Sequence, residues 1–176
     1  MTKAIDLYVG LDDSNHAGYK LGEVDVAVFS LIPEDGKTKL SRRRDFSALF
    51  KWLNVSEKRD FRYCVLEGER FRHIYSNLPA VAPYIIDNFL ATFRRQLRDI
   101  SIYIDGVVKP EDEERIREHF RSRFPNLTLE HFKKPKKKVH KCPVVLFRAD
   151  ALANYLYRQE IESPNKILLP DEFKNE

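Results

Sequence analysis

Two adjacent carboxylates, Asp12 and Asp13, follow a stretch of sequence whose pattern predicts a β-strand. In residues 5–12 apolar side chains alternate with polar or small ones, which is the period-2 signature of a half-buried strand. Acids at the end of a sheet strand lie where open α/β sheets bind their ligands. Two interpretations are open for this pair. The acids are solvated loop residues, or they hold a divalent cation such as Mg²⁺, which prefers oxygen ligands.

Two further acids occupy positions from which they could join this pair. Residues 100–105 repeat the alternating pattern and end in Asp105. A strand–helix–strand connection of this length favours parallel strands, so we expect Asp105 and Asp12 at the same edge of the sheet. An aspartate that opens a turn is the alternative for Asp105. Asp150 lies in a predicted helix over residues 143–157, at the border of its apolar face, which favours a position over the sheet edge.

Glu67 and His16 are alternative site residues. Glu67 closes a predicted strand over residues 61–67, and an acid at a strand end is a candidate ligand. Local ion pairing with Arg70 and Arg72 would also explain it. His16 follows the paired acids and could orient a phosphate or protonate a leaving group, although a lone loop histidine often does neither.

Length and composition favour one soluble domain. A chain of 176 residues can bury one sizeable core, and we expect a domain over residues 1–158 and a C-terminal tail over residues 159–176. No apolar run approaches the length that a membrane span needs. The N-terminus enters a predicted strand without a signal-peptide pattern, and two cysteines, Cys64 and Cys142, suit a reducing compartment. These features predict a cytoplasmic protein.

Positive charge is concentrated in short segments, above all residues 133–141, although the formal net charge is only +4. A basic stripe suits a polyanionic partner such as nucleic acid, while a solvated surface would look similar. We expect the following side chains to contact a nucleic-acid backbone: Lys136, Lys137, Lys138, Lys141 and Arg148. Candidates for stacking on bases are Tyr8, His73, Tyr75 and Tyr103, with a place in the core as the alternative for the strand tyrosines.

The order of the predicted elements indicates an α/β fold. We expect an antiparallel meander of three strands, then helices alternating with strands, and a long helix at the end. The predicted segments, in order, are strands over 5–15, 24–32 and 37–41, a helix over 45–53, a strand over 61–67, a helix from 79, a strand over 100–105, a helix over 110–124, an edge strand over 127–132 and a helix over 143–157.

This order, with its acids, resembles the ribonuclease H-like superfamily. The motifs Leu11-Asp12-Asp13, Ile104-Asp105-Gly106 and Ala149-Asp150-Ala151 are similar to those of type 2 ribonuclease H. The resemblance implies a mixed five-stranded sheet, an antiparallel three-strand meander plus parallel strands, flanked by helices. Type 2 enzymes follow their paired acids with a glycine-arginine-glycine segment and carry glutamate as the second acid. This chain has Ser14 to Gly18 and Asp13 there, which argues against hybrid-specific cleavage.

In size, basic segment and Asp12-Asp13-Ser14-Asn15 start, the chain resembles an archaeal branch of this superfamily that digests single-stranded DNA from 3′ to 5′ and assembles as trimers. The resemblance implies two-metal phosphodiester hydrolysis with Mg²⁺ or Mn²⁺. It implies that Asp12 bridges the metals, that Asp105 and Asp150 each hold one, and that Asp13 is a ligand or an acceptor beside them.

Two alternatives remain open from the sequence. One is a structure-selective endonuclease or resolvase in which Glu67 replaces Asp105 as ligand. The other is a non-catalytic nucleic-acid-binding module of the same fold. Convergence of the acids in space would distinguish a nuclease from the binding module, because a binding module has no need for Asp12, Asp105 and Asp150 to meet.

Overall fold

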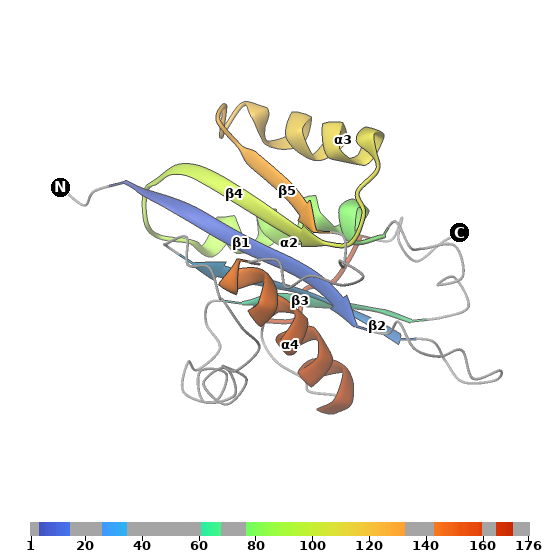
Figure 1. The fold of residues 1–176 in the computed structure, drawn as a ribbon. Helices are drawn as coiled ribbons and strands as arrows, with labels where there is room; N and C mark the ends of the chain where they lie inside the picture. Colours follow the sequence, from blue (N-terminus) through green and yellow to red (C-terminus); the bar gives the residue numbers. More distant parts are fainter. Residues whose placement is uncertain are drawn as a thin grey trace.

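The computed structural model describes residues 4–14, 26–34, 61–67, 77–132, 143–159 and 165–170, which form one sheet with helices on both faces (Figure 1). The strands are β1 (Ile5–Ser14), β2 (Val26–Glu34), β3 (Arg62–Glu67), β4 (Leu97–Asp105) and β5 (Thr128–Phe132). The helices are α2 (Asn77–Thr92), α3 (Pro110–Arg121) and α4 (Val144–Gln159). The α/β class predicted from the sequence is confirmed.

The five strands follow the order β3-β2-β1-β4-β5, with β1 in the centre. β1 pairs in parallel with β4, and β4 pairs in parallel with β5. β2 is antiparallel to both of its neighbours, β1 and β3. The parallel pairing predicted for residues 5–12 and 100–105 is therefore confirmed.

β3 pairs along the edge of β2 opposite β1, with Cys64 opposite Phe29. Residues 61–64, which lead into and begin β3, are buried in the core, and this burial favours their place in the sheet. The predicted strand over residues 37–41 and the predicted helix over 45–53 lie outside the described residues.

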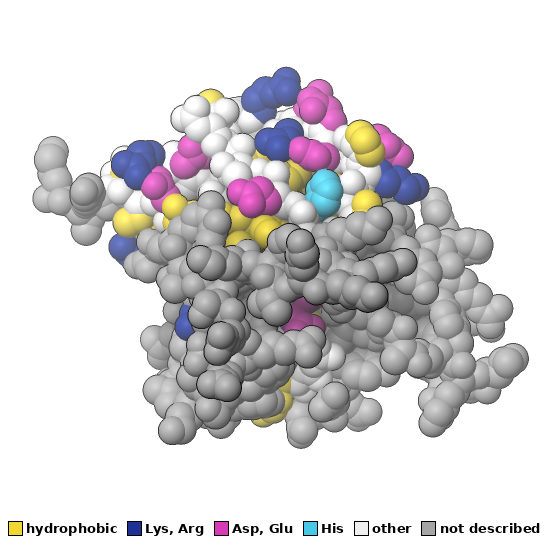
Figure 2. All heavy atoms as spheres, in the orientation of Figure 1, with side chains coloured by type: hydrophobic (Ala, Val, Ile, Leu, Met, Phe, Trp, Pro, Cys, Tyr) yellow, Lys and Arg dark blue, Asp and Glu magenta, His cyan; other side chains and the backbone are white. Residues whose placement is uncertain are grey.

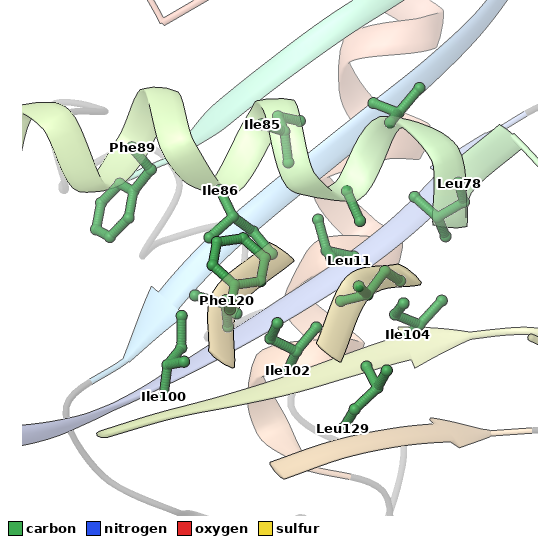
Figure 3. Close-up of a cluster of buried hydrophobic side chains, with 14 of the residues drawn as sticks. Leu11, Leu78, Ile85, Ile86, Phe89, Ile100, Ile102, Ile104, Phe120 and Leu129 are labelled. Atoms are coloured by element: carbon green, nitrogen blue, oxygen red, sulfur yellow. The ribbon is translucent and has the colours of Figure 1, made fainter. Parts of the chain in front are cut away.

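The main core lies between the sheet and the helices α2 and α3 (Figure 3). Alternate residues of the two central parallel strands supply its floor, and each is 1% exposed or less: Leu7, Val9, Leu11, Ile100, Ile102 and Ile104. From above, α2 contributes Val81, Ile85 and Phe89, the stripe predicted from helical spacing. Burying each such side chain contributes about 1.5–3 kcal/mol. The even-numbered residues of β1 consequently point to the opposite face.

That opposite face is covered by α4, which packs mainly on β1 and β2 (Figure 1). A second buried cluster joins helix and sheet here, including Tyr103, Val145, Leu152 and Leu156. Gly10 lies under the first turn of α4, where an added Cβ would stand 2.3 Å from the carbonyl oxygen of Val145. The helix therefore contacts the backbone of β1 directly.

Part of the predicted tail belongs to the core. The Tyr63 N–H donates to the carbonyl of Asn165 (3.1 Å), and the Ile167 N–H donates to the carbonyl of Tyr63 (2.7 Å), which extends the sheet beyond β3. Ile167 and Leu169 are buried in the main cluster. Residues 165–170 therefore dock on the domain that precedes them. Among the described helices, none has the length and apolarity needed to cross a membrane.

Charged side chains of both signs intermingle on the visible part of the described surface (Figure 2). On α3, Arg117 pairs with Glu113 (2.7 Å) and Arg121 with Glu114 (3.1 Å). Such exposed helical pairs contribute little to stability. The described part of this face is thus a mixed-charge surface rather than a basic stripe.

Candidate active site

The ends of β1 and β4 place two carboxylates on adjacent strands. The register pairs Leu11 with Ile104, so the next residue on each strand is Asp12 and Asp105 respectively. Since Leu11 and Ile104 face the main core, strand alternation turns Asp12 and Asp105 toward the face covered by α4. The prediction that these acids finish at the same edge of the sheet is confirmed.

Asp12 is buried, with 1% of its surface exposed. Its Oδ1 accepts a hydrogen bond from the backbone N–H of Asp13 at 2.8 Å. Its Oδ2 is also buried and has no hydrogen-bond partner among the described residues. Buried polar atoms are nearly always satisfied, and a charged one without a partner is costly. The Oδ2 of Asp12 is therefore suited to bind a cation or to accept a hydrogen bond from a ligand.

The surroundings of Asp12 raise its pKa to about 9. Burial is the largest cause, followed by the negative charges of Asp105 and then of Asp150. The hydrogen bond from the Asp13 N–H acts in the opposite direction but is outweighed. Asp105 and Asp150 therefore lie near enough to Asp12 to oppose its ionisation. Strand ends and α4 bring these three acids into one electrostatic environment.

Asp150 is half-buried on α4, and two features that sequence reasoning missed determine its place. The Nδ2 of Asn154 donates to the Oδ1 and to the carbonyl oxygen of Asp150, both at 2.9 Å. Gly10 permits the close packing of α4 on β1. The available signals were the i,i+4 spacing of Asp150 and Asn154 and a lone glycine inside a strand pattern.

Asp13 does not join the other three acids. It remains within β1, paired with Phe29, so alternation directs its side chain to the face opposite Asp12. Its charge makes the smallest contribution to the pKa of Asp12. The hydrogen bond from the backbone N–H of Asp13 has a larger effect on the pKa of Asp12 than the charge of the Asp13 side chain.

Glu67 lies apart from the group. It pairs with Val26 at the end of β3, whereas Asp12 pairs with Ser30. Glu67 is thus two strands from Asp12 and four residues farther along β2, roughly 13 Å in the strand direction. Asp105, rather than Glu67, is the strand-borne acid that the sheet brings beside Asp12.

The remaining predicted contacts divide into described and undescribed residues. Arg148 is half-buried on α4, two residues before Asp150, and burial lowers the pKa of its guanidinium. Tyr103 is buried and stacks on Tyr8, with ring centroids 6.4 Å apart, so it takes the core position that was its alternative to stacking on a base. The following predicted residues lie outside the described part of the chain: His16, His73, Tyr75, Lys136, Lys137, Lys138 and Lys141.

The acids do not form a ready-made metal cage. Among the described residues, no group of three or more His, Cys, Asp or Glu side chains has the closeness that metal ligation requires. Asp105 and Asp150 can raise the pKa of Asp12 without lying close enough to share a cation with it, because carboxylates repel one another when no cation lies between them. The all-oxygen donor set and the unsatisfied Oδ2 of Asp12 fit Mg²⁺ or Mn²⁺ in chemical type.

Comparisons with known proteins leave the family of the chain open. No family model and no curated protein matches it. A chain from the structure of the PCNA:RNase HII complex from Archaeoglobus fulgidus is similar, with a TM-score of 0.43 and 11% identity over 96% of this chain and 85% of that chain. A TM-score below 0.5 does not establish a common fold.

Proposed function

We propose that this chain is a divalent-metal-dependent nuclease of ribonuclease H-like fold. The observation that carries the proposal is Asp12: a buried carboxylate with an unsatisfied Oδ2, whose pKa is raised by burial and then by the charges of Asp105 and Asp150. A fold gains nothing in stability from burying an acid among other acids. Perturbed carboxylates of this kind are typical of functional sites.

The order of the elements supports the same proposal. An antiparallel β1–β2–β3 arrangement is joined to the parallel strands β4 and β5, and the last helix in the described part of the chain, α4, lies over the sheet. Asp12 and Asp105 lie at the ends of β1 and β4, and Asp150 lies on α4. This is the order of strands and acids expected from the resemblance to the ribonuclease H-like superfamily.

In this proposal Asp12, Asp105 and Asp150 hold two Mg²⁺ or Mn²⁺ ions. Bound cations of this type activate an attacking water and stabilise the leaving oxygen of a phosphodiester. The protein contributes the orientation of the acids. The Asp13 N–H holds Oδ1 of Asp12, which leaves Oδ2 for ligation, and Asn154 holds Oδ1 of Asp150. Burial keeps Asp12 in a low-dielectric environment, where its interaction with a cation is strong.

The specific activity that we propose is 3′-to-5′ digestion of single-stranded DNA in the cytoplasm by a homotrimer, and it rests on the resemblance to archaeal exonucleases. In this proposal Arg148, which is half-buried on α4, would contact a phosphate of the substrate backbone. The lysines at 136–138 and 141 would contact the backbone farther along the strand.

Digestion of 5′-labelled substrates tests the proposal. Single-stranded DNA, single-stranded RNA and duplex DNA are incubated with Mg²⁺, Mn²⁺ or EDTA, using the native chain and the variants Asp12→Asn and Asp105→Asn. Asp6→Asn is the matched control, because Asp6 lies on the same strand and face as Asp12 but near the start of β1, paired with Arg98. We expect a metal-dependent ladder on single-stranded DNA that Asp12→Asn and Asp105→Asn abolish and Asp6→Asn retains.

Other outcomes select the alternatives. Internal cuts at branched or duplex sites would indicate an endonuclease. Retention of uncut substrate in a gel shift, in the presence of either metal, would indicate a nucleic-acid-binding module and would reject catalysis.

A further inference from the structure

Asp150 differs from the other two proposed ligands because it reaches the site from a helix. Asp12 and Asp105 are placed by the hydrogen-bonded register of β1 and β4. No such register links α4 to the sheet. The position of Asp150 therefore depends on how closely α4 packs on β1 and on how its own side chain is oriented.

Gly10 determines how closely α4 packs on β1. It lies two residues before Asp12 on the same face of β1, and its missing Cβ leaves room for the helix backbone. An added Cβ would lie 2.3 Å from the carbonyl oxygen of Val145, 2.5 Å from its carbonyl carbon and 2.8 Å from the nitrogen of Leu146. All three atoms are backbone, so no change of rotamer relieves the contact.

The size of the required movement is large on the scale of metal ligation. Real Cβ contacts are essentially never shorter than 3.0 Å, so α4 would have to move outward by about 0.7 Å to clear the nearest atom. Asp150 follows Val145 by five residues, about 7.5 Å along the same rigid helix, and would move with it. Functional groups must be held within about 0.5 Å of productive geometry.

Asn154 determines the orientation of the Asp150 side chain. Its Nδ2 donates to Oδ1 of Asp150 at 2.9 Å and, at the same distance, to the carbonyl oxygen of that residue. The first bond restricts rotation of the carboxylate, and the second holds the amide of Asn154 against the helix. Hydrogen-bond donors of this kind orient the carboxylates that ligate metals.

We propose that Gly10 and Asn154 are positioning residues for Asp150: Gly10 sets the separation of α4 from β1, and Asn154 fixes the carboxylate, so that Asp150 can share a divalent cation with Asp12. This inference rests on the proposed function. It assigns to two uncharged residues, on different elements, control over the affinity of the site for metal.

Binding of Mn²⁺ alone, measured by electron paramagnetic resonance without nucleic acid, tests the proposal. Asn154→Leu keeps the side-chain volume and removes the donor, and Gly10→Ala adds the obstructing Cβ. We expect each to weaken Mn²⁺ binding by about 10-fold or more, the loss that follows removal of a group orienting a metal ligand.

Two matched controls affect the other face of the sheet. Asn88→Leu also removes an asparagine hydrogen bond, to Arg62, and Ala82→Val also enlarges a buried small residue between helix and sheet, on α2. Both should bind Mn²⁺ as the native chain does. If Gly10→Ala does not fold, Asn154→Leu decides.

The outcomes distinguish the inference from the proposed function. Native-like Mn²⁺ affinity in folded Asn154→Leu and Gly10→Ala, with loss of binding in Asp12→Asn, would overturn the inference and leave the metal site intact. Equal weakening in the Asn88→Leu and Ala82→Val controls would also overturn it, since general destabilisation would then be the cause. No Mn²⁺ binding by the native chain would reject both.

Discussion

Replacement of Asp12 by asparagine should stabilise the metal-free protein. The carboxyl group of Asp12 is buried beside Asp105 and Asp150, and its pKa is raised from 3.8 to about 9. A raised carboxyl pKa carries no penalty below pH 3.8, where the group is protonated in both the folded and the unfolded chain. Between pH 4 and 9 the unfolded chain ionises Asp12 and the folded chain does not, so stability falls as pH rises.

The magnitude follows from the size of the shift. Each pH unit in this window costs about 1.4 kcal/mol, and pH 7 lies about 3 units above the ordinary pKa. The largest gain from Asp12→Asn at pH 7 is therefore about 4 kcal/mol, and relaxation around the site in solution reduces it to roughly 2–4 kcal/mol. For a chain of this length such a gain raises Tm by roughly 4–16 °C. The asparagine retains an acceptor for the Asp13 N–H.

Urea unfolding in EDTA at pH 5, 7 and 9 measures this effect on the native chain and on Asp12→Asn. The difference in unfolding free energy should favour the variant and should grow with pH. Asp6→Asn is the control with the opposite sign, because the hydrogen bond from Arg98 lowers the pKa of Asp6, and its ionised form stabilises the fold above pH 4. A variant that is less stable than the native chain at pH 7, or a difference that does not change from pH 5 to 9, would refute the reasoning.

Three other outcomes are expected. Saturating Mg²⁺ or Mn²⁺, at about 100 times Kd, should raise the stability of the native chain by about 2.7 kcal/mol, and thermal unfolding of Asp12→Asn should show little or none of this gain. Ile167→Ala should lower the free energy of unfolding in urea by about 2–4 kcal/mol, because Ile167 is buried in the main core. Leu168→Ala is the control: its side chain is 85% exposed, and the change should be less than about 0.5 kcal/mol. Equal effects of the two substitutions would contradict docking of residues 165–170. Burial raises the pKa of the Cys64 thiol, so in a Cys142→Ser variant a disulfide reagent should react only after unfolding, and fast reaction of the folded protein would show that Cys64 is accessible.

Local patterns predicted the parts of the fold that depend on strand alternation. The alternation in residues 5–12 and 100–105 identified both central parallel strands, their core face and the acids at their ends. Asp105 and Asp12 therefore came together as expected. The same alternation separates Asp12 from Asp13, because β1 continues to Ser14 and successive residues of a strand point to opposite faces of the sheet. The two adjacent acids therefore do not act as one unit at the strand end.

Interactions between distant segments were beyond the reach of local patterns. β3 pairs with β2 although residues 35–61 separate the two strands along the chain, and residues 61–64 are buried there. Gly10 contacts Val145, which lies 135 positions later in the chain, and no periodic pattern in the sequence predicts this contact. Docking of Ile167 on β3 depends likewise on the sheet edge that only the folded chain creates. Registers and helix-to-sheet distances therefore required the structure.

The central claim is that Asp12, Asp105 and Asp150 bind a divalent cation together. Anomalous diffraction from crystals soaked in Mn²⁺, collected at the manganese absorption edge, tests it most directly. The account predicts a peak bounded by these three carboxylates, with Oδ2 of Asp12 among the ligands, and no peak there in Asp12→Asn crystals. Saturating Mn²⁺ that leaves this position empty, or that binds in the native chain without contact to Asp12, would contradict it.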